Sequence, residues 1–284
     1  MPAAGSAGLS VATALAAWAG TALRWLHVTA AVAWLGLLLY VVALDRRLKP
    51  RSGVPQGAAG EAWLVLEGGL CRVTGYRAAP AGLRERPAWF RWQAYATWGA
   101  GFGLLVLAYA GRGPRLTDPA VLPGWAAAGV GLGAILLGYL AYEGLCRSPV
   151  GRDERVLALV GIALLGPVAW TLARLLGARG AAVHLGALLG TCMAANVAHV
   201  IIPAQRRALA ALAEGGEPDQ RRLREAARRS RHNGLLVLPT VLFMLGGHAP
   251  LGAAGGWGWL GAVALAAVGY GAGYLVLGGG SKDG

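Results

Sequence analysis

Apolar stretches of about 20 residues recur along this chain, and they constrain its fold more than any other feature. A helix needs about that many apolar residues to cross the hydrocarbon core of a bilayer. Apolar residues make up 56% of the 284 residues and charged residues only 14%, a balance that is unusual for a soluble domain of this size. The sequence therefore predicts an all-α fold, a polytopic bundle of transmembrane helices.

The apolar runs predict about seven spans and a simple domain organisation. We expect an N-terminal interfacial segment over residues 1–21, an integral membrane domain over 22–279 and a tail over 280–284. The first positive residue is Arg24, so we expect a retained first span and no signal peptide. The predicted spans are 22–44, 90–110, 120–143, 156–176, 180–202, 233–248 and 257–278.

The positive charge of the chain indicates its orientation. The net charge of +13 lies in the loops between spans, which is typical of a topology signal and not of nucleic-acid binding. All but five of the 26 Lys and Arg fall on one side of the seven predicted spans. The positive-inside rule then predicts an N-terminus outside and a C-terminus in the cytoplasm. The five residues on the opposite side are Arg24, Arg112, Arg115, Arg174 and Arg179.

Two long loops are predicted on the cytoplasmic side. Residues 45–88 contain Gly68-Gly69, Trp63 and Tyr76, which favours an ordered lid over a bare linker. Residues 203–231 predict a solvated basic helix on the membrane surface, with binding of an anionic substrate or lipid as the alternative. The arginines at helical spacing are Arg221, Arg222, Arg224, Arg228, Arg229 and Arg231.

The five histidines lie in or at the ends of the predicted spans, where an imidazole needs a partner, water or a metal. His27, His184 and His248 form an outer layer, and His199 and His232 form an inner layer. The spacings 184–199 and 232–248 correspond to about 22 and 24 Å of helix. Two antiparallel helices would then offer axial ligands to one or two haem b groups. For each histidine the alternative is a hydrogen-bonded packing residue.

The three cysteines exclude one kind of haem attachment. Cys71, Cys146 and Cys192 lie far apart and form no CxxCH, so the chain encodes no covalent c-type haem.

A set of motifs recurs in order along the chain, from about residue 24 to 250. The segments are RWLHVTAAVAWLG (24–36), WFRWQAYATWGAGF (89–102), DPAVL (118–122), CRSPVG (146–151), VHLGALLGTCMAANVAHVIIPAQR (183–206), RHNGLLVLP and GGHAP (within 231–250). Together these motifs resemble the membrane domain of the bacterial membrane-bound urate hydroxylase (urate oxidase) family.

The resemblance implies a multi-pass protein of a bacterial inner membrane that oxidises urate, a purine, to 5-hydroxyisourate and passes electrons to a cytochrome c. In the family that cytochrome is usually fused at the C-terminus. This chain stops at Gly284, so we expect a separate cytochrome c as acceptor. His27, His184, His232 and His248 match the family, and His199 is an addition. The resemblance thus implies haem iron at His27, His184 and His248.

The chain also departs from the family pattern. Where the family has a His-Gly-Gly-Gly segment and a second His, this chain reads EGGLCRV, with Glu67 and Arg72 at those positions. Where the family has Trp-Glu-Ala-Tyr, this chain has Gln93. These changes put urate oxidation in question.

We expect a few polar residues to bind the substrate. Arg91, or an arginine of the 45–88 loop, would clamp the urate anion, and Gln93 or Asn196 would hydrogen-bond its ring. The alternative for Arg91 is an interface residue whose aliphatic stem lies along the membrane while its guanidinium reaches water.

Two other functions remain open from the sequence. A non-catalytic haem b electron carrier would explain the retained histidines and the changed positions together. A copper-handling membrane protein would fit His27 followed by Trp34 and Gly36, although three methionines are few for a Cu(I) relay.

Overall fold

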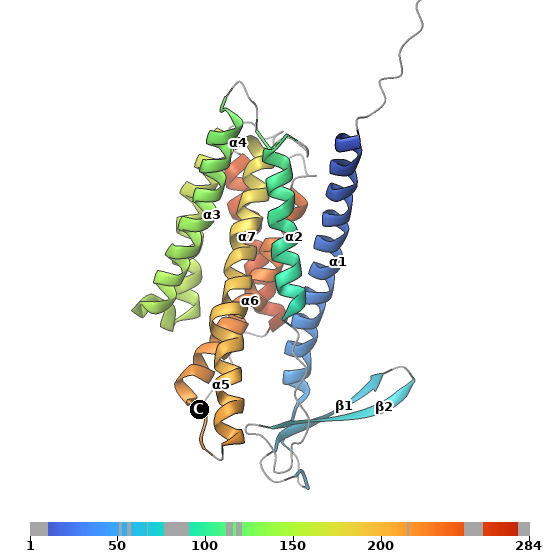
Figure 1. Cartoon of the computed structure of the whole chain (residues 1–284). Helices are drawn as coiled ribbons and strands as arrows, with labels where there is room; N and C mark the ends of the chain where they lie inside the picture. The colour runs from blue at the N-terminus through green and yellow to red at the C-terminus, as the bar shows by residue number, and fades with distance from the viewer. Residues whose placement is uncertain are drawn as a thin grey trace, which may run out of the picture.

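The structure is a computed structural model that describes residues 11–50, 53–55, 58–66, 68–76, 91–111, 116–117, 121–214, 216–246 and 258–277. These residues are mostly helical (Figure 1). The elements are α1 (Val11–Arg47), β1 (Ala58–Leu66), β2 (Gly69–Tyr76), α2 (Trp92–Tyr109), α3 (Gly124–Arg147), η1 (Pro149–Arg152), α4 (Glu154–Ala195), η2 (Asn196–Ile201), α5 (Ile202–Ala213), α6 (Gln220–Gly246) and α7 (Gly258–Leu277).

Four helical stretches among the described residues are long and apolar enough to cross a membrane, so the chain is built to be embedded in one. Large apolar side chains such as Leu137 and Val268 point outwards from these helices, as contact with lipid requires. The four stretches are Thr13–Asp45, Gly124–Arg147, Glu154–Ala213 and Gly258–Leu275.

The third of these stretches bends sharply at Gly177. That residue has φ 73° and ψ 174°, a conformation that favours glycine because it has no Cβ. The predicted spans 156–176 and 180–202 lie in the two arms on either side of this bend. Gly180 follows closely, and a Cβ there would lie 2.3 Å from the carbonyl oxygen of Leu116.

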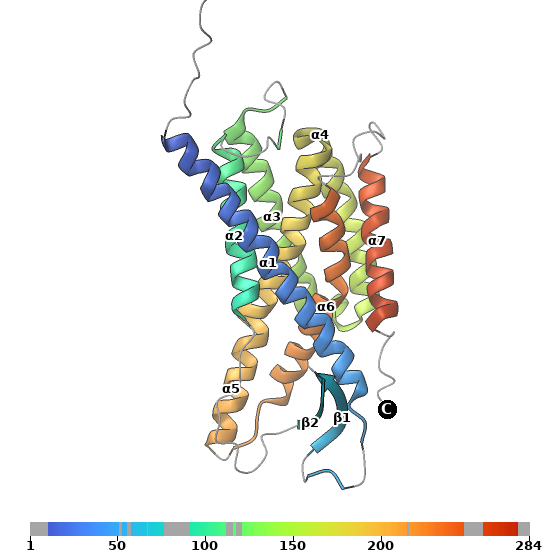
Figure 2. The same ribbon diagram turned by 90° about the vertical axis from the view of Figure 1, so that its right-hand side faces the viewer.

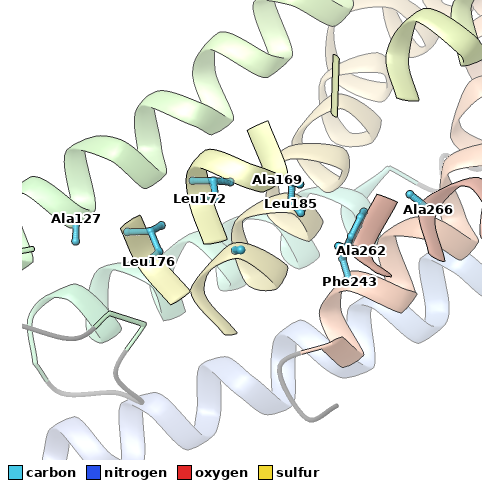
Figure 3. Close-up of a cluster of buried hydrophobic side chains, with 9 residues drawn as sticks. Ala127, Ala169, Leu172, Leu176, Leu185, Phe243, Ala262 and Ala266 are labelled. Carbon is cyan, nitrogen blue, oxygen red and sulfur yellow. The ribbon is translucent and has the colours of Figure 1, made fainter. Parts of the chain in front are cut away.

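The helices run side by side along a common direction, and α1 crosses the outside of the bundle at a tilt (Figures 1 and 2). Neighbours pack as α1 on α2, α3 on α4, and α6 between α4 and α7. The core between α3, α4, α6 and α7 is built mainly from alanine and leucine, with one phenylalanine (Figure 3); among its residues are Ala127, Leu185, Phe243 and Ala266. Alanines at these positions let the helix backbones approach closely, as in other membrane bundles.

An antiparallel hairpin, β1–β2, departs from the all-α prediction. Its strands pair from Ala58↔Tyr76 to Leu66↔Gly69, and Gly68 turns with φ 81°. The base is tied to the end of α1, because Lys49 and Glu61 exchange backbone hydrogen bonds of 3.0 and 3.3 Å. The predicted order of the 45–88 loop therefore takes the form of a β-hairpin, while residues 77–88 lie outside the described part.

The prediction of a fully solvated basic helix over residues 203–231 is wrong in one respect, the burial of one of its sides. The segment forms α5 and the first turns of α6, which continues without interruption to Gly246. Because the basic segment continues a bundle helix, one side of it faces other helices, and Arg229 there is only 1% exposed. Arg221, Arg222 and Arg224 are exposed as predicted.

Candidate functional site

Arg229 is the centre of a buried polar cluster at the end of the bundle that carries α5. Its guanidinium donates to Glu143 Oε2 on α3 at 2.8 Å, to Glu225 Oε1 at 2.9 Å and to Asn196 Oδ1 at 3.0 Å. A buried charge without partners would cost several kcal/mol, about 3–5 by analogy with broken buried ion pairs. Burial acts to lower the pKa of Arg229, but the bonds to Glu143 and Glu225 outweigh it and raise the pKa, so this group stays charged.

Asn196 extends the cluster from the charged side to the aromatic side. Its side-chain nitrogen donates to the Tyr142 hydroxyl oxygen and to Asn233 Oδ1, both at 2.8 Å. Asn233 in turn donates to the carbonyl oxygen of Met193 at 3.1 Å. Asn196 and Asn233 are both nearly fully buried, so their amides depend on protein groups and not on bulk water for hydrogen bonds.

His232 ends the cluster with an open hydrogen-bond position. Its Nδ1 lies 3.0 Å from the Tyr142 hydroxyl and 3.9 Å from Cys146 Sγ. Because Asn196 already donates to the Tyr142 oxygen, the Tyr142 hydroxyl proton is directed at His232 Nδ1. His232 is 4% exposed, and its Nε2 has no hydrogen-bond partner among the described residues.

The backbone at Asn196 is a π-helix, η2, over Asn196–Ile201. Pro203 follows directly and has no N–H to donate to the carbonyl of His199, so the regular α pattern is broken there. Single π turns of this kind are frequent at functional sites. His199 is exposed on this turn, with Nδ1 3.4 Å from the Tyr139 hydroxyl.

A cavity of about 700 Å³ opens against this cluster. Its lining includes His199 and Cys146, with three acidic residues, Glu143, Asp219 and Glu225. Seven arginines also line it: Arg147, Arg152, Arg207, Arg221, Arg222, Arg228 and Arg229. Because the arginines outnumber the acidic residues, the lining is strongly positive.

Three of the cavity arginines are available to a ligand. Arg152, Arg207 and Arg221 are all exposed, and none of their side chains makes an ion pair with any other described residue. Asp219 is engaged instead, since it caps α6 and pairs with Arg222 at 3.0 Å. Backbone and side-chain hydrogen bonds from Arg222 lower the pKa of the Asp219 carboxyl.

His184 is fully buried near the opposite end of the bundle, and both its ring nitrogens are engaged. Nδ1 lies 2.7 Å from the carbonyl oxygen of Gly180, which can only accept, so Nδ1 carries the proton. Nε2 accepts from the Tyr109 hydroxyl at 2.7 Å. A Cβ at Gly131 would lie 2.3 Å from Nε2, so α3 packs directly on the ring.

His27 is held against α2. Its Nδ1 lies 2.8 Å from the carbonyl oxygen of Thr97, and a Cβ at Gly101 would lie 2.8 Å from its ring. This fixes the tautomer with the proton on Nδ1 and leaves Nε2 as the basic nitrogen. His27 and His184 thus bind different neighbours, and His248 lies outside the described residues.

The histidines fit a haem in part. A metal-bound histidine usually donates its other ring N–H to a carbonyl, as His27 and His184 both do. At His184, however, the Tyr109 hydroxyl occupies the position that a metal would take. Among the described residues no three His, Cys, Asp or Glu side chains gather, so copper handling gains no ligand set.

The predicted substrate residues fall in different places. Asn196 joins the buried cluster, whereas Arg91 lies over the Trp92 ring at 5.2 Å, and Gln93 Oε1 is buried without a partner among the described residues. Neither Arg91 nor Gln93 lines the cavity.

Arg72, one of the residues that depart from the family pattern, also lies away from the cavity. Arg72 lies on β2, 3.8 Å from Glu61, while Glu67 is outside the described residues.

The sequence reasoning did not find Arg229, Glu143 and Tyr142 as a group. A signal was present, because Tyr142 and Glu143 are polar residues at the end of an apolar span, and Arg229 lies one turn after Glu225. Nothing in the sequence alone indicated that α6 would turn Arg229 towards α3.

The chain matches the protein family described as urate oxidase N-terminal over residues 13–276. This confirms the resemblance drawn from the motifs. No curated protein and no solved structure matches the chain. The match covers nearly the whole sequence, and the chain belongs to the urate oxidase N-terminal family.

Proposed function

We propose that this chain is a membrane oxidoreductase that oxidises urate to 5-hydroxyisourate, with the arginine-lined cavity as the substrate site. The observation that carries the proposal is the cavity of about 700 Å³ beside the buried Arg229 cluster, in a chain of this family. The volume is in the range of ordinary small-molecule sites, roughly 300–1,000 Å³. The polar and charged lining suits a planar purine anion better than an apolar ligand.

The proposal includes a seven-span topology in a bacterial plasma membrane. The spans would be α1, α2, α3, the two arms of α4, the apolar part of α6, and α7. The positive-inside rule then supports a cytoplasmic cavity, because the arginines of α5, α6 and η1 gather at that end. Urate would reach the site from the cytoplasm.

Recognition of the anion would fall to Arg152 and Arg207, which have no other ion pair among the described residues. A guanidinium presents a planar set of donors that matches the edge of a planar anion. Arg229 would form part of the rigid wall behind it, since its hydrogen bond to Asn196 and its ion pairs fix the guanidinium.

The reaction needs a proton acceptor as well as an electron acceptor. Urate and water give 5-hydroxyisourate, two protons and two electrons. Glu143 is a poor base here because Arg229 and Arg147 both hold its carboxylate. His232 is the better candidate, since it is joined to the cluster through Tyr142 and lies 3.9 Å from the cavity residue Cys146.

The electrons would leave one at a time to a separate cytochrome c. Haem b, when bound, would supply the one-electron relay, and His27 is the residue best prepared to hold it, because its Nδ1 is anchored and its Nε2 is the basic nitrogen.

The test is urate-dependent reduction of added cytochrome c by the purified chain in lipid nanodiscs, with urate loss followed in parallel. We expect turnover, and we expect Arg152→Gln and Arg207→Gln each to raise the KM for urate about tenfold, as loss of a charged hydrogen bond implies. The matched control is Arg224→Gln, which removes the same charge from an exposed position outside the cavity lining.

Two outcomes would contradict the proposal. If folded, haem-loaded protein leaves urate unchanged, the chain is an electron carrier without a purine substrate. If all three variants change KM equally, the substrate is attracted by net charge and does not bind in the cavity.

A further inference from the structure

The β1–β2 hairpin presents an apolar face that no described part of the chain covers. Trp63 pairs with Arg72 and Val65 with Leu70, so these four side chains share one face of the ribbon. Trp63 is 51% exposed, and Val65 and Leu70 are each 75% exposed. Cys71 pairs with Leu64 and therefore points to the opposite face.

Only the base of the hairpin is packed. Ala62 and Glu61 are buried, and a Cβ at Gly60 would lie 2.9 Å from the backbone of Lys49. An isolated two-stranded hairpin is marginally stable in water, so its distal half needs a second contact. Clustered exposed apolar side chains generally mark such a contact surface.

The position of the hairpin indicates what that contact is. The hairpin leaves the end of α1 and runs across the direction of the helices, and its tip extends past α1 on the side away from α3 (Figure 1). In the turned view the hairpin lies below the end of α1, at the same end of the molecule as α5 (Figure 2). α1 contains one of the candidate membrane spans and carries exposed apolar side chains such as Val28 and Val32, so its side away from the bundle faces lipid. The surface nearest to the tip is therefore the bilayer surface.

We propose that the hairpin lies flat on the inner surface of the bilayer, with the face of Trp63, Val65 and Leu70 in the headgroup layer. Trp is favoured at this interface because its ring is apolar with a polar edge, and valine and leucine gain from leaving water. Arg72 is on the same face. Its Nε lies 3.8 Å from Glu61 on that face, but 56% of its side chain is exposed, so its terminal nitrogens can still reach lipid phosphate while its stem stays among apolar groups. The inference is independent of the urate reaction.

The cysteines of the chain make a direct test possible. Cys71 is exposed, while Cys146 and Cys192 are buried, so a thiol-reactive fluorophore labels Cys71 in the folded protein. A second protein, Cys71→Ser with Leu70→Cys, moves the label by one residue to the apolar face. Both are placed in nanodiscs of phosphatidylcholine and phosphatidylglycerol, and quenching is measured with aqueous iodide and with headgroup-nitroxide lipids.

We expect the label at position 70 to be quenched several-fold more by the nitroxide lipids, and several-fold less by iodide, than the label at position 71. Equal access of both labels to iodide would overturn the inference. Protection of position 70 that is unchanged in detergent, with no quenching by nitroxide lipids, would also overturn it, because it would place protein on this face.

Discussion

Arg229 and Asn196 are joined by a hydrogen bond of 3.0 Å although neither side chain has appreciable contact with water. The bond ties α6 to the π-helix η2, and the ion pair of Arg229 with Glu143 adds α3 to the same junction. Three helical elements thus meet at one guanidinium. The wall of the cavity is rigid for this reason, and removal of Arg229 should affect both the fold and the site.

Arg229→Gln should destabilise the chain strongly. The shorter neutral side chain leaves the Glu143 and Glu225 carboxylates without their shared partner, and broken buried ion pairs cost about 3–5 kcal/mol. We expect a clearly lower thermal midpoint in detergent. Arg222→Gln is the control: among the described residues its guanidinium pairs only with Asp219, at an exposed position, so its loss should leave the midpoint nearly unchanged. Equal midpoints for the two variants would mean that the buried junction does not stabilise the bundle.

Tyr142→Phe should lower the free energy of unfolding clearly, whereas Tyr139→Phe should change it little. Loss of the Tyr142 hydroxyl leaves Asn196 and His232 each short of a hydrogen bond inside the protein, at about 1–3 kcal/mol. Tyr139 makes one long contact of 3.4 Å with the exposed His199. The measurement is thermal or denaturant unfolding of both variants beside the native chain. A loss of unfolding free energy for Tyr139→Phe as large as that for Tyr142→Phe would contradict this account.

The membrane-spanning segments could be predicted from the sequence because the apolar runs are long, and most positive charges lie between these runs or at their ends. The family could be read from motifs in order. The two arms of α4 were also separable, since the Gly177-to-Gly180 segment interrupts the apolar run. These features are local, and local sequence determines them.

The site was less predictable because it depends on rotation of helices about their axes. The stretch of arginines indicates a basic helix, but which arginine faces α3 depends on packing, and that arginine is Arg229. The histidine layers show the same limit, since depth in the membrane follows from sequence position whereas the neighbours of each ring do not. The hairpin was expected only as an ordered loop, because β1 carries Gly60 and alanines that are poor strand signals.

Gly131→Ala should disturb the His184–Tyr109 pair. The added Cβ would lie 2.3 Å from His184 Nε2 and 2.6 Å from the Tyr109 hydroxyl, so α3 and α4 must separate or the pair must break. Overpacking of this kind costs about 1–3 kcal/mol. Gly133→Ala on the same helix meets nothing within 4 Å and should be neutral or slightly stabilising. Comparable unfolding midpoints for the two variants would show that the close packing around His184 is absent.

Gly101→Ala should weaken the docking of α1 on α2. A Cβ at this position would lie 2.8 Å from His27 Cε1 and 2.9 Å from Nδ1, and the ring cannot yield without losing its bond to Thr97. Gly99→Ala is the matched control on α2, with nothing within 4 Å. Compared with Gly99→Ala, we expect Gly101→Ala to be cleaved faster by limited proteolysis in the segment after α1 and to unfold at a lower midpoint. If haem binds at His27, Gly101→Ala should also shift its absorption spectrum while Gly99→Ala should not.

His232→Asn separates the structural role of this residue from its proposed role as proton acceptor. The asparagine oxygen can take the place of Nδ1 and accept from Tyr142, so the cluster keeps its hydrogen bonds. The amide has no basic nitrogen, however, and cannot accept a proton at neutral pH. We expect an unfolding midpoint close to that of the native chain and a kcat for urate oxidation at least about a hundredfold lower, as loss of general base catalysis implies. The KM should change little, because His232 is not part of the cavity lining.

The pH dependence of kcat tests the role of His232 directly. The native enzyme should lose activity at low pH as the imidazole is protonated, and the residual activity of His232→Asn should not show this loss. An unchanged kcat would remove His232 from the reaction and leave its Nε2–H, which has no partner among the described residues, as a feature of packing.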